Sequence, residues 1–126
     1  MDRVVKVRVP VRSFRDLEIW QRGVDLVEKI YKITKSFPRE ELYGLTGQLR
    51  RAAVSIPSNI AEGFARQHNK EYRQFLYVAL GSCAEMYTQT TVAKRLGLVA
   101  NPEAAAVLDE LDQLSRMTMT LIKRLT

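Results

Sequence analysis

The sequence predicts an all-α protein, namely an antiparallel up-down four-helix bundle preceded by a basic, extended N-terminal arm. Four segments after residue 13 repeat apolar residues every three or four positions, which is the spacing of a helix with one buried face. The connections between them are short, so consecutive helices are expected to run antiparallel. Outside the arm no segment alternates as a strand does. These observations divide the chain into an arm, 1–13, and a bundle domain, 14–126.

The composition is that of one globular domain. The chain has 126 residues, of which 46% are hydrophobic and 27% charged, and this length is enough to bury a core. No stretch approaches the ~18 apolar residues of a transmembrane helix, so no membrane contact is expected. The first 20 residues lack the apolar segment of a secretory signal, which makes the cytoplasm the expected location. With a single cysteine, Cys83, an intrachain disulfide is impossible.

The arm holds most of the excess positive charge. The whole chain has 20 Lys and Arg against 14 Asp and Glu, a net charge of +6. Residues 1–15 contain one acid, Asp2, against Arg3, Lys6, Arg8, Arg12 and Arg15. Basic arms bind nucleic acid or other polyanions, and a solvated tail is the alternative. The alternating valines predict either an edge strand that pairs with the body or another chain, or a disordered arm: Val5, Val7, Val9 and Val11.

The first helix is predicted over 16–37. Ser13 is the expected N-cap, Asp16 completes a capping box, and Pro38 ends the helix. Its apolar residues form two stripes whose centres lie roughly 100° apart around the axis. One stripe is Leu17, Trp20, Val24, Val27, Tyr31 and Thr34, and the other is Ile19, Gly23, Leu26, Ile30, Ile33 and Phe37. Two stripes indicate a helix that packs on two sides, either centrally in the bundle or also against another subunit.

The second helix is predicted from its N-cap, Thr46, to Glu62, after a turn over 38–43. Its apolar face consists of Leu49, Ala52, Ala53, Ile56 and Ile60. Pro57 lies inside this helix and has no N–H to donate, so we expect a kink. Gly63 is the expected stop signal.

The third and fourth helices have clear boundary signals. Asn69 is the expected N-cap of the third helix, which ends in a Schellman motif at Gly97. Asn101 followed by Pro102 predicts an N-cap and first turn for the fourth helix. Gly81, inside the third helix, costs about 1 kcal/mol relative to alanine. It therefore indicates either the close approach of another backbone or a cost that is simply tolerated.

The sequence offers little for catalysis or metal binding. A di-metal site in a bundle needs two Glu-x-x-His motifs and further carboxylates, whereas this chain has one histidine, His68, in a predicted loop. Cys83 lies on the apolar face of the third helix, where a thiol is usually inert, and His68 is about four helical turns away. The scattered glycines do not form a phosphate-binding loop. We therefore expect no enzymatic activity, no cofactor and no metal.

Five basic residues bracket the second helix and the loop after it: Arg50, Arg51, Arg66, Lys70 and Arg73. The acids nearby are Glu62 and Glu71. Arg51 and Glu62 share a helix face but lie about 16 Å apart along the axis, too far to pair. One interpretation is that the cluster contacts phosphates, together with Arg8 and Arg12 of the arm. The other is that it forms ion pairs within the protein or with another chain.

The run QLRRAAVSIPSNIAEG, residues 48–63, resembles the signature of the four-helix-bundle proteins encoded in bacterial 23S rRNA intervening sequences. Three further stretches agree, so that the resemblance spans about residues 14–122: Phe14 to Leu17 with Trp20, Phe75-Leu76 with Ala79, and Gly81-Ser82 leading to Glu85 and Thr88-Gln89. The resemblance gives the role of a structural motif to Pro57, Asn59, Glu62 and Gly63.

The resemblance implies an antiparallel bundle without established enzymatic activity and, for relatives, a ring-shaped homopentamer. Related proteins include the accessory variability determinant of diversity-generating retroelements, a basic ring that binds nucleic acid and a reverse transcriptase. The expected function is that of a cytoplasmic, non-enzymatic homo-oligomer, with a pentamer as the expected assembly, that binds RNA or DNA through basic residues. The main alternative is a protein-interaction or scaffolding ring with no nucleic-acid role. A bundle that binds a small molecule is a third interpretation.

Overall fold

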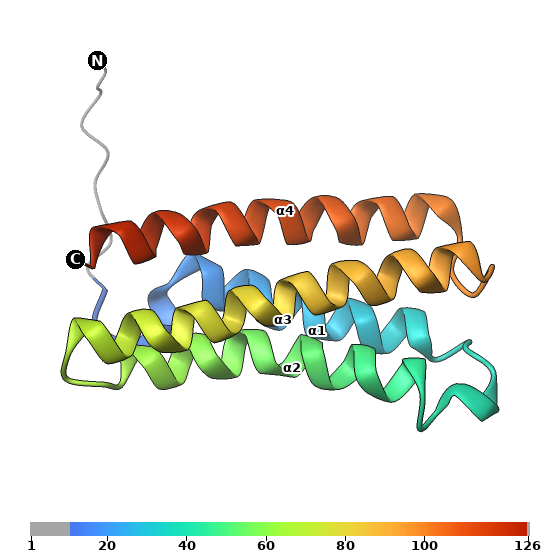
Figure 1. The fold of residues 1–126 in the computed structure, drawn as a ribbon, viewed down its shortest axis with the longest axis horizontal. Coiled ribbons are helices and arrows are strands. Elements are labelled where there is room, and N and C mark those ends of the chain that lie inside the picture. Colours follow the sequence, from blue (N-terminus) through green and yellow to red (C-terminus); the bar gives the residue numbers. More distant parts are fainter. Residues whose placement is uncertain (1–10, 126) are drawn as a thin grey trace, which may run out of the picture.

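The structure, a computed structural model, describes residues 11–125. This part of the chain is all-α and confirms the predicted up-down bundle of four helices (Figure 1). In chain order the elements are the 3-10 helix η1 (Phe14–Asp16), α1 (Glu18–Thr34), the 3-10 helix η2 (Arg39–Glu41), α2 (Leu45–Phe64), α3 (Asn69–Arg95) and α4 (Asn101–Arg124). The strand predicted in the arm begins outside the described residues, and Arg8 lies there too.

The four helices lie side by side, and each runs antiparallel to the one before it (Figure 1). Each helix contacts the next, and α4 closes the bundle against α1 through the smallest of the four helix–helix contacts. The start of α1, the α2–α3 connection and the end of α4 share one end of the bundle, which we call the terminal end. The α1–α2 and α3–α4 connections share the other end, which we call the turn end. Charged residues far apart in the sequence therefore meet at the same end.

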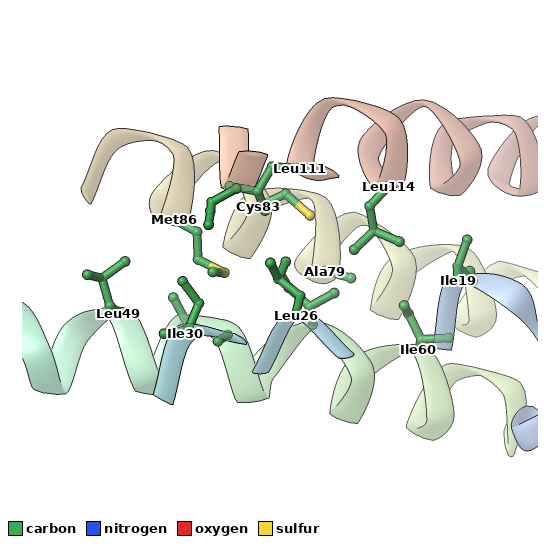
Figure 2. Close-up of a cluster of buried hydrophobic side chains, with 14 of the residues drawn as sticks. Ile19, Leu26, Ile30, Leu49, Ile60, Ala79, Cys83, Met86, Leu111 and Leu114 are labelled. Atoms are coloured by element: carbon green, nitrogen blue, oxygen red, sulfur yellow. The ribbon is translucent and has the colours of Figure 1, made fainter. Parts of the chain in front are cut away.

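The core runs along the bundle and takes side chains from all four helices (Figure 2). Its largest fully buried side chains are Ile30, Ile56, Ile60, Leu76, Met86, Leu111, Leu114, Val107 and Thr118. Burying an aliphatic side chain of this size contributes about 1.5–3 kcal/mol, so the core supplies much of the stability. Cys83 is buried in it, as its place on the apolar face predicts, and burial raises the pKa of the thiol. A thiol in this setting stays protonated and unreactive.

Pro57 is buried in α2 and packs against α1. α2 continues as one helix through the proline, and the predicted kink stays a prediction. A Cβ atom on Gly23 of α1 would lie 3.3 Å from the Pro57 Cβ, so the two helices approach closely here. Elsewhere on α2, the Asn59 side-chain amide donates to the Ser55 carbonyl over 2.8 Å, and the hydroxyls of Ser55 and Ser82 are 2.8 Å apart. Pro57 thus packs α2 against α1, and Ser55, to which Asn59 is bonded, joins α2 to α3.

The first helix is shorter than predicted at both ends. Ser13 and Asp16 do form a capping box, but the box caps η1. Leu17 is extended, with φ −76° and ψ 126°, and separates η1 from α1. At the other end α1 stops at Thr34. The turn after it, closed by a 3.0 Å bond from the Phe37 N–H to the Thr34 carbonyl, brings the Phe37 side chain into the core.

The second helix begins one residue before Thr46 and ends two residues after Glu62, so both predicted boundary signals are displaced. Thr46 is not the N-cap, because α2 begins at Leu45, whose N–H donates to the Glu41 carboxylate over 3.2 Å. Gly63 is not a stop signal, because α2 extends one residue beyond it. A Cβ at Gly63 would lie 2.8 Å from the Cβ of Phe75 on α3. The glycine therefore permits close packing of α2 on α3.

The predicted N-caps of the third and fourth helices are each off by one position. Asn69 and Asn101 are the first helical residues of α3 and α4, and the extended residue before each is the N-cap. The predicted Schellman motif is confirmed. Gly97 has φ 75°, and the Leu98 N–H donates to the Ala93 carbonyl over 2.9 Å.

Candidate nucleic-acid interface

The five basic residues predicted as one cluster divide between different parts of the bundle. Arg66 lies in the α2–α3 connection, and Lys70 and Arg73 lie in the first two turns of α3, all at the terminal end. Arg50 and Arg51 lie near the start of α2, about 22–24 Å away along the helix by its rise per residue. The structure thus brings three of the five together.

Two of these three side chains have partners within the chain. The Nη2 atom of Arg66 lies 3.1 Å from Oε2 of Glu62, and its guanidinium lies 4.8 Å from the centre of the Phe75 ring. The Nη1 atom of Arg73 donates to the Leu125 carbonyl over 2.6 Å and so ties the end of α4 to α3. Each guanidinium uses only part of its donors in these contacts, and the others remain available to a ligand.

Lys70 and Arg12 are exposed at the terminal end, and neither side chain has an ion-pair or hydrogen-bond partner within residues 11–125. The backbone N–H of Arg12 donates to Oδ2 of Asp16 over 2.9 Å, and this bond holds the backbone from which the Arg12 side chain extends. No internal ion pair has to be broken when either side chain meets an anion. These two residues are therefore available cations of the candidate interface.

The sequence interpretation missed the basic residues that α4 brings to the same end: Arg116, Lys123 and Arg124. Arg15 of η1, counted with the arm in the sequence, lies at this end too. The segments that meet there, 11–18, 62–73 and 116–125, contain eight basic and four acidic residues. The predicted topology would have been enough to place these basic residues at one end. In an up-down bundle, the starts of the odd-numbered helices and the ends of the even-numbered helices share one end.

Charge varies along the bundle. At the turn end, the segments 30–50 and 90–103 hold six basic and three acidic residues. The remaining described segments, at the middle of the bundle, hold three basic and six acidic residues. Half of those acids lie close together on α4: Asp109, Glu110 and Asp112. A polyanion is therefore repelled by the middle of the bundle and attracted by its ends.

Arg50 and Arg51 have different surroundings although they are adjacent. The Nε atom of Arg50 donates to Oγ1 of Thr34 over 2.9 Å, and its guanidinium lies 4.5 Å from the centre of the Tyr31 ring, so it faces α1. Arg51 is exposed and lines a hollow between α2 and α3, together with Glu85. The two arginines therefore belong to different surfaces.

No group of three or more His, Cys, Asp and Glu side chains that could hold a metal ion occurs in residues 11–125. Within the same part of the chain, no helix is long and apolar enough to cross a bilayer. His68 is exposed in the α2–α3 connection, whereas Cys83 is buried in α3, about 22 Å further along by the helix rise. The thiol and the imidazole are therefore too far apart to act together.

Residues 15–120 match the profile of the family described as 23S rRNA-intervening sequence protein. A similar fold occurs in the crystal structure of a protein of unknown function from the S23 ribosomal protein family of Bacteroides thetaiotaomicron VPI-5482. The two chains share 17% sequence identity with a TM-score of 0.75, and the match covers 83% of this chain and 98% of the other. That likeness supports the fold alone. No curated protein matches the chain significantly.

Proposed function

The chain belongs to the 23S rRNA-intervening sequence protein family, and we propose that it is a non-enzymatic, homo-oligomeric helical bundle that binds RNA or DNA. The observation that carries the nucleic-acid part is the unpaired positive charge at the terminal end. Lys70 and Arg12 have no acidic partner in the described chain. The segment 1–10, which joins the bundle at residue 11, adds three basic residues and one acid.

Binding of this kind is electrostatic and weakly selective for sequence. No base-reading motif occurs in the chain, so contacts to phosphates supply most of the affinity. Each phosphate that a lysine or arginine neutralises releases counterions, and the affinity therefore falls as a power of the salt concentration. In an oligomer the terminal end is repeated in every copy, which adds avidity to individually weak contacts.

Two apolar faces support self-association. Of the two stripes on α1, one is buried, and on the other Val24 and Tyr31 remain 40% and 44% exposed. On the outer face of α3, Tyr77 and Val78 are 53% and 51% exposed. Gly81 lies on the same helix, and no atom comes within 4 Å of a Cβ built on it, so the described chain offers no packing reason for this glycine. Covering these faces with further copies removes apolar surface from water.

The nucleic-acid proposal is tested by measuring affinity for a short single-stranded RNA and for a duplex over a range of salt concentrations. The test variant replaces three exposed basic residues of the terminal end by glutamate: Arg12, Lys70 and Arg124. The matched control replaces three exposed lysines elsewhere and changes the net charge equally: Lys29, Lys32 and Lys94. We expect the test variant to lose about tenfold or more in affinity at low salt and to show a shallower salt dependence. The control, in which Lys32 and Lys94 lie at the turn end, should lose less affinity and keep more of the salt dependence.

Equal losses in the two variants would mean that only net charge matters. A protein that binds neither RNA nor DNA at low salt, yet remains oligomeric, would favour the alternative function of a protein-interaction or scaffolding ring. The exposed apolar faces of α1 and α3 are compatible with that alternative as well.

A further inference from the structure

We propose that a hollow at the turn end, between α1, η2 and the start of α2, binds a phosphate group. Three basic side chains line it and no acidic one does: Lys35, Arg39 and Arg50. The hollow encloses about 260 Å³, slightly less than the ≈300 Å³ lower bound of typical ligand pockets. Its size suits one small charged group with a short attachment.

Arg50 is fixed in orientation before any ligand arrives. Its Nε atom donates to Oγ1 of Thr34 over 2.9 Å, and the buried Thr34 hydroxyl donates in turn to the Ile30 carbonyl over 2.7 Å. The face of the guanidinium lies 4.5 Å from the centre of the Tyr31 ring. The terminal nitrogens have no partner within residues 11–125. A guanidinium held along one edge and one face offers paired donors to phosphate oxygens at small entropic cost.

Lys35 and Arg39 complete the positive lining. Both are exposed, and neither side chain has an ion-pair partner in the described part of the chain. Two acids do lie close in sequence, at Glu40 and Glu41, but neither lines the hollow, and Oε1 of Glu41 accepts the Leu45 N–H over 3.2 Å. Three cations gathered without a lining acid repel one another, and a bound anion relieves that repulsion.

Thr46 supplies an independent observation. It lines the hollow, is 3% exposed, and its Oγ1 makes no hydrogen bond with any described residue. A buried hydroxyl without a partner costs stability, which a bound hydrogen-bond acceptor would recover. Thr46 also lies in the first turn of α2. The Leu45 N–H there already donates to Glu41, and the other N–H groups of the turn and the helix dipole favour an anion. Together, these groups form an anion site. They are the fixed guanidinium of Arg50, the exposed side chains of Lys35 and Arg39, the buried hydroxyl of Thr46 and the N-terminus of α2.

The phosphate has two possible sources, the backbone of a nucleic acid or a free phosphorylated small molecule. The hollow lies at the opposite end of the bundle from Arg12, Lys70 and Arg124. Its test therefore succeeds or fails independently of the nucleic-acid interface proposed above.

The experiment is a calorimetric titration of the full chain with inorganic phosphate at constant ionic strength. We expect saturable binding with one phosphate per chain. Two variants should weaken it tenfold or more, Arg50→Gln and the double variant Lys35→Gln with Arg39→Gln, the latter changing only exposed side chains. Arg51→Gln is the matched control, because it removes the same charge one residue away without touching the hollow. Unsaturable binding, or equal loss in Arg50→Gln and Arg51→Gln, would overturn the proposal.

Competition identifies the source. Displacement of phosphate by glycerol phosphate, but not by glycerol or by a pentathymidine without terminal phosphates, would assign the site to a free phosphomonoester. Displacement by the pentathymidine would assign it to a nucleic-acid backbone. Thr46→Val should raise the melting temperature of the phosphate-free protein and weaken phosphate binding. If Thr46→Val raises the melting temperature but leaves the affinity for phosphate unchanged, the proposed contact between the Thr46 hydroxyl and phosphate is contradicted.

Discussion

Arg22 of α1 and Glu110 of α4 are joined by two parallel hydrogen bonds, Nε to Oε2 and Nη2 to Oε1, each 2.8 Å long. The same guanidinium donates to Oε1 of Gln113 over 2.6 Å. The side chains of Arg22 and Glu110 are only 23% and 27% exposed. These bonds cross the smallest helix–helix contact of the bundle, so the ion pair adds to the attachment of α4 to α1.

Replacing Arg22 by methionine should lower the free energy of unfolding by about 1–3 kcal/mol, because charged hydrogen bonds of this geometry are lost while the apolar stem is kept. Urea unfolding measures the loss. The control is Arg66→Met, which breaks an i,i+4 pair with Glu62 whose side chains are 40% and 56% exposed. That change also removes the contact of the guanidinium with the Phe75 ring, and it should cost no more than about 1 kcal/mol. Equal costs for the two variants would contradict the role given to Arg22.

Gly63→Ala should destabilise the bundle although alanine favours helices. The added Cβ would lie 2.8 Å from the Phe75 Cβ and 3.2 Å from the Tyr72 carbonyl oxygen, so α2 and α3 would have to separate. Overpacking of this kind costs about 1–3 kcal/mol, which outweighs the ~1 kcal/mol gained in helix propensity. Gly23→Ala should cost less, because its nearest contact would be 3.3 Å. Thermal melts that rank the two variants in the opposite order would contradict this packing.

Stability should fall at alkaline pH because of Tyr72. Burial raises the pKa of its hydroxyl from 10.0 to about 12. The unfolded chain therefore loses this proton at a lower pH than the folded chain does. The stabilisation is fully present below pH 10.0 and is lost as the pH rises toward about 12. Melting curves across this window should show a smaller fall for Tyr72→Phe than for the unchanged chain, and identical falls would contradict the burial effect.

The helices and their buried faces could be predicted from the sequence, because apolar spacing alone determines which side of each helix faces the core. Helix ends were harder to predict. Gly63 looks like a stop signal in sequence, yet its function is to admit Phe75, a contact between helices. Thr46 resembles an N-cap, but the carboxylate of Glu41 is the side-chain group that accepts a hydrogen bond at the start of α2, from the Leu45 N–H. Both errors arise because tertiary contacts override local signals.

The candidate site could be predicted only in part for a related reason. Arg50 and Arg51 are close to Arg66 in the sequence, but the length of α2 separates them in space. Conversely, Arg124 is distant in sequence from Lys70, and the antiparallel packing of α4 brings both to the terminal end. Along a helix, a shared surface is therefore indicated by a spacing of three or four residues, not by proximity in the chain as such.

Assembly is tested most directly at Gly81, because stability and association should change there in opposite directions. No atom lies within 4 Å of a Cβ built at this position, so Gly81→Ala should raise the free energy of unfolding of the isolated chain by about 1 kcal/mol through helix propensity. If another copy approaches α3 at this glycine, the same methyl group should weaken the assembly. Light scattering should give the unchanged protein a mass about five times 14.4 kDa, the expected pentamer, and the variant a smaller mass at the same concentration.

Gly97→Ala is the control for that experiment, because the positive φ of 75° makes it destabilising without adding a group to the outer face of α3. It should lower the melting temperature and leave the assembled mass unchanged. A Gly81→Ala protein that is more stable and assembles normally would remove α3 from the interface. The exposed stripe of α1, with Val24 and Tyr31, would then be the remaining candidate. A mass near 14.4 kDa for the unchanged protein at micromolar concentration would contradict the proposed homo-oligomer, because 14.4 kDa is the mass of one chain. The apolar faces of α1 and α3 would then be exposed to solvent and not covered by further copies.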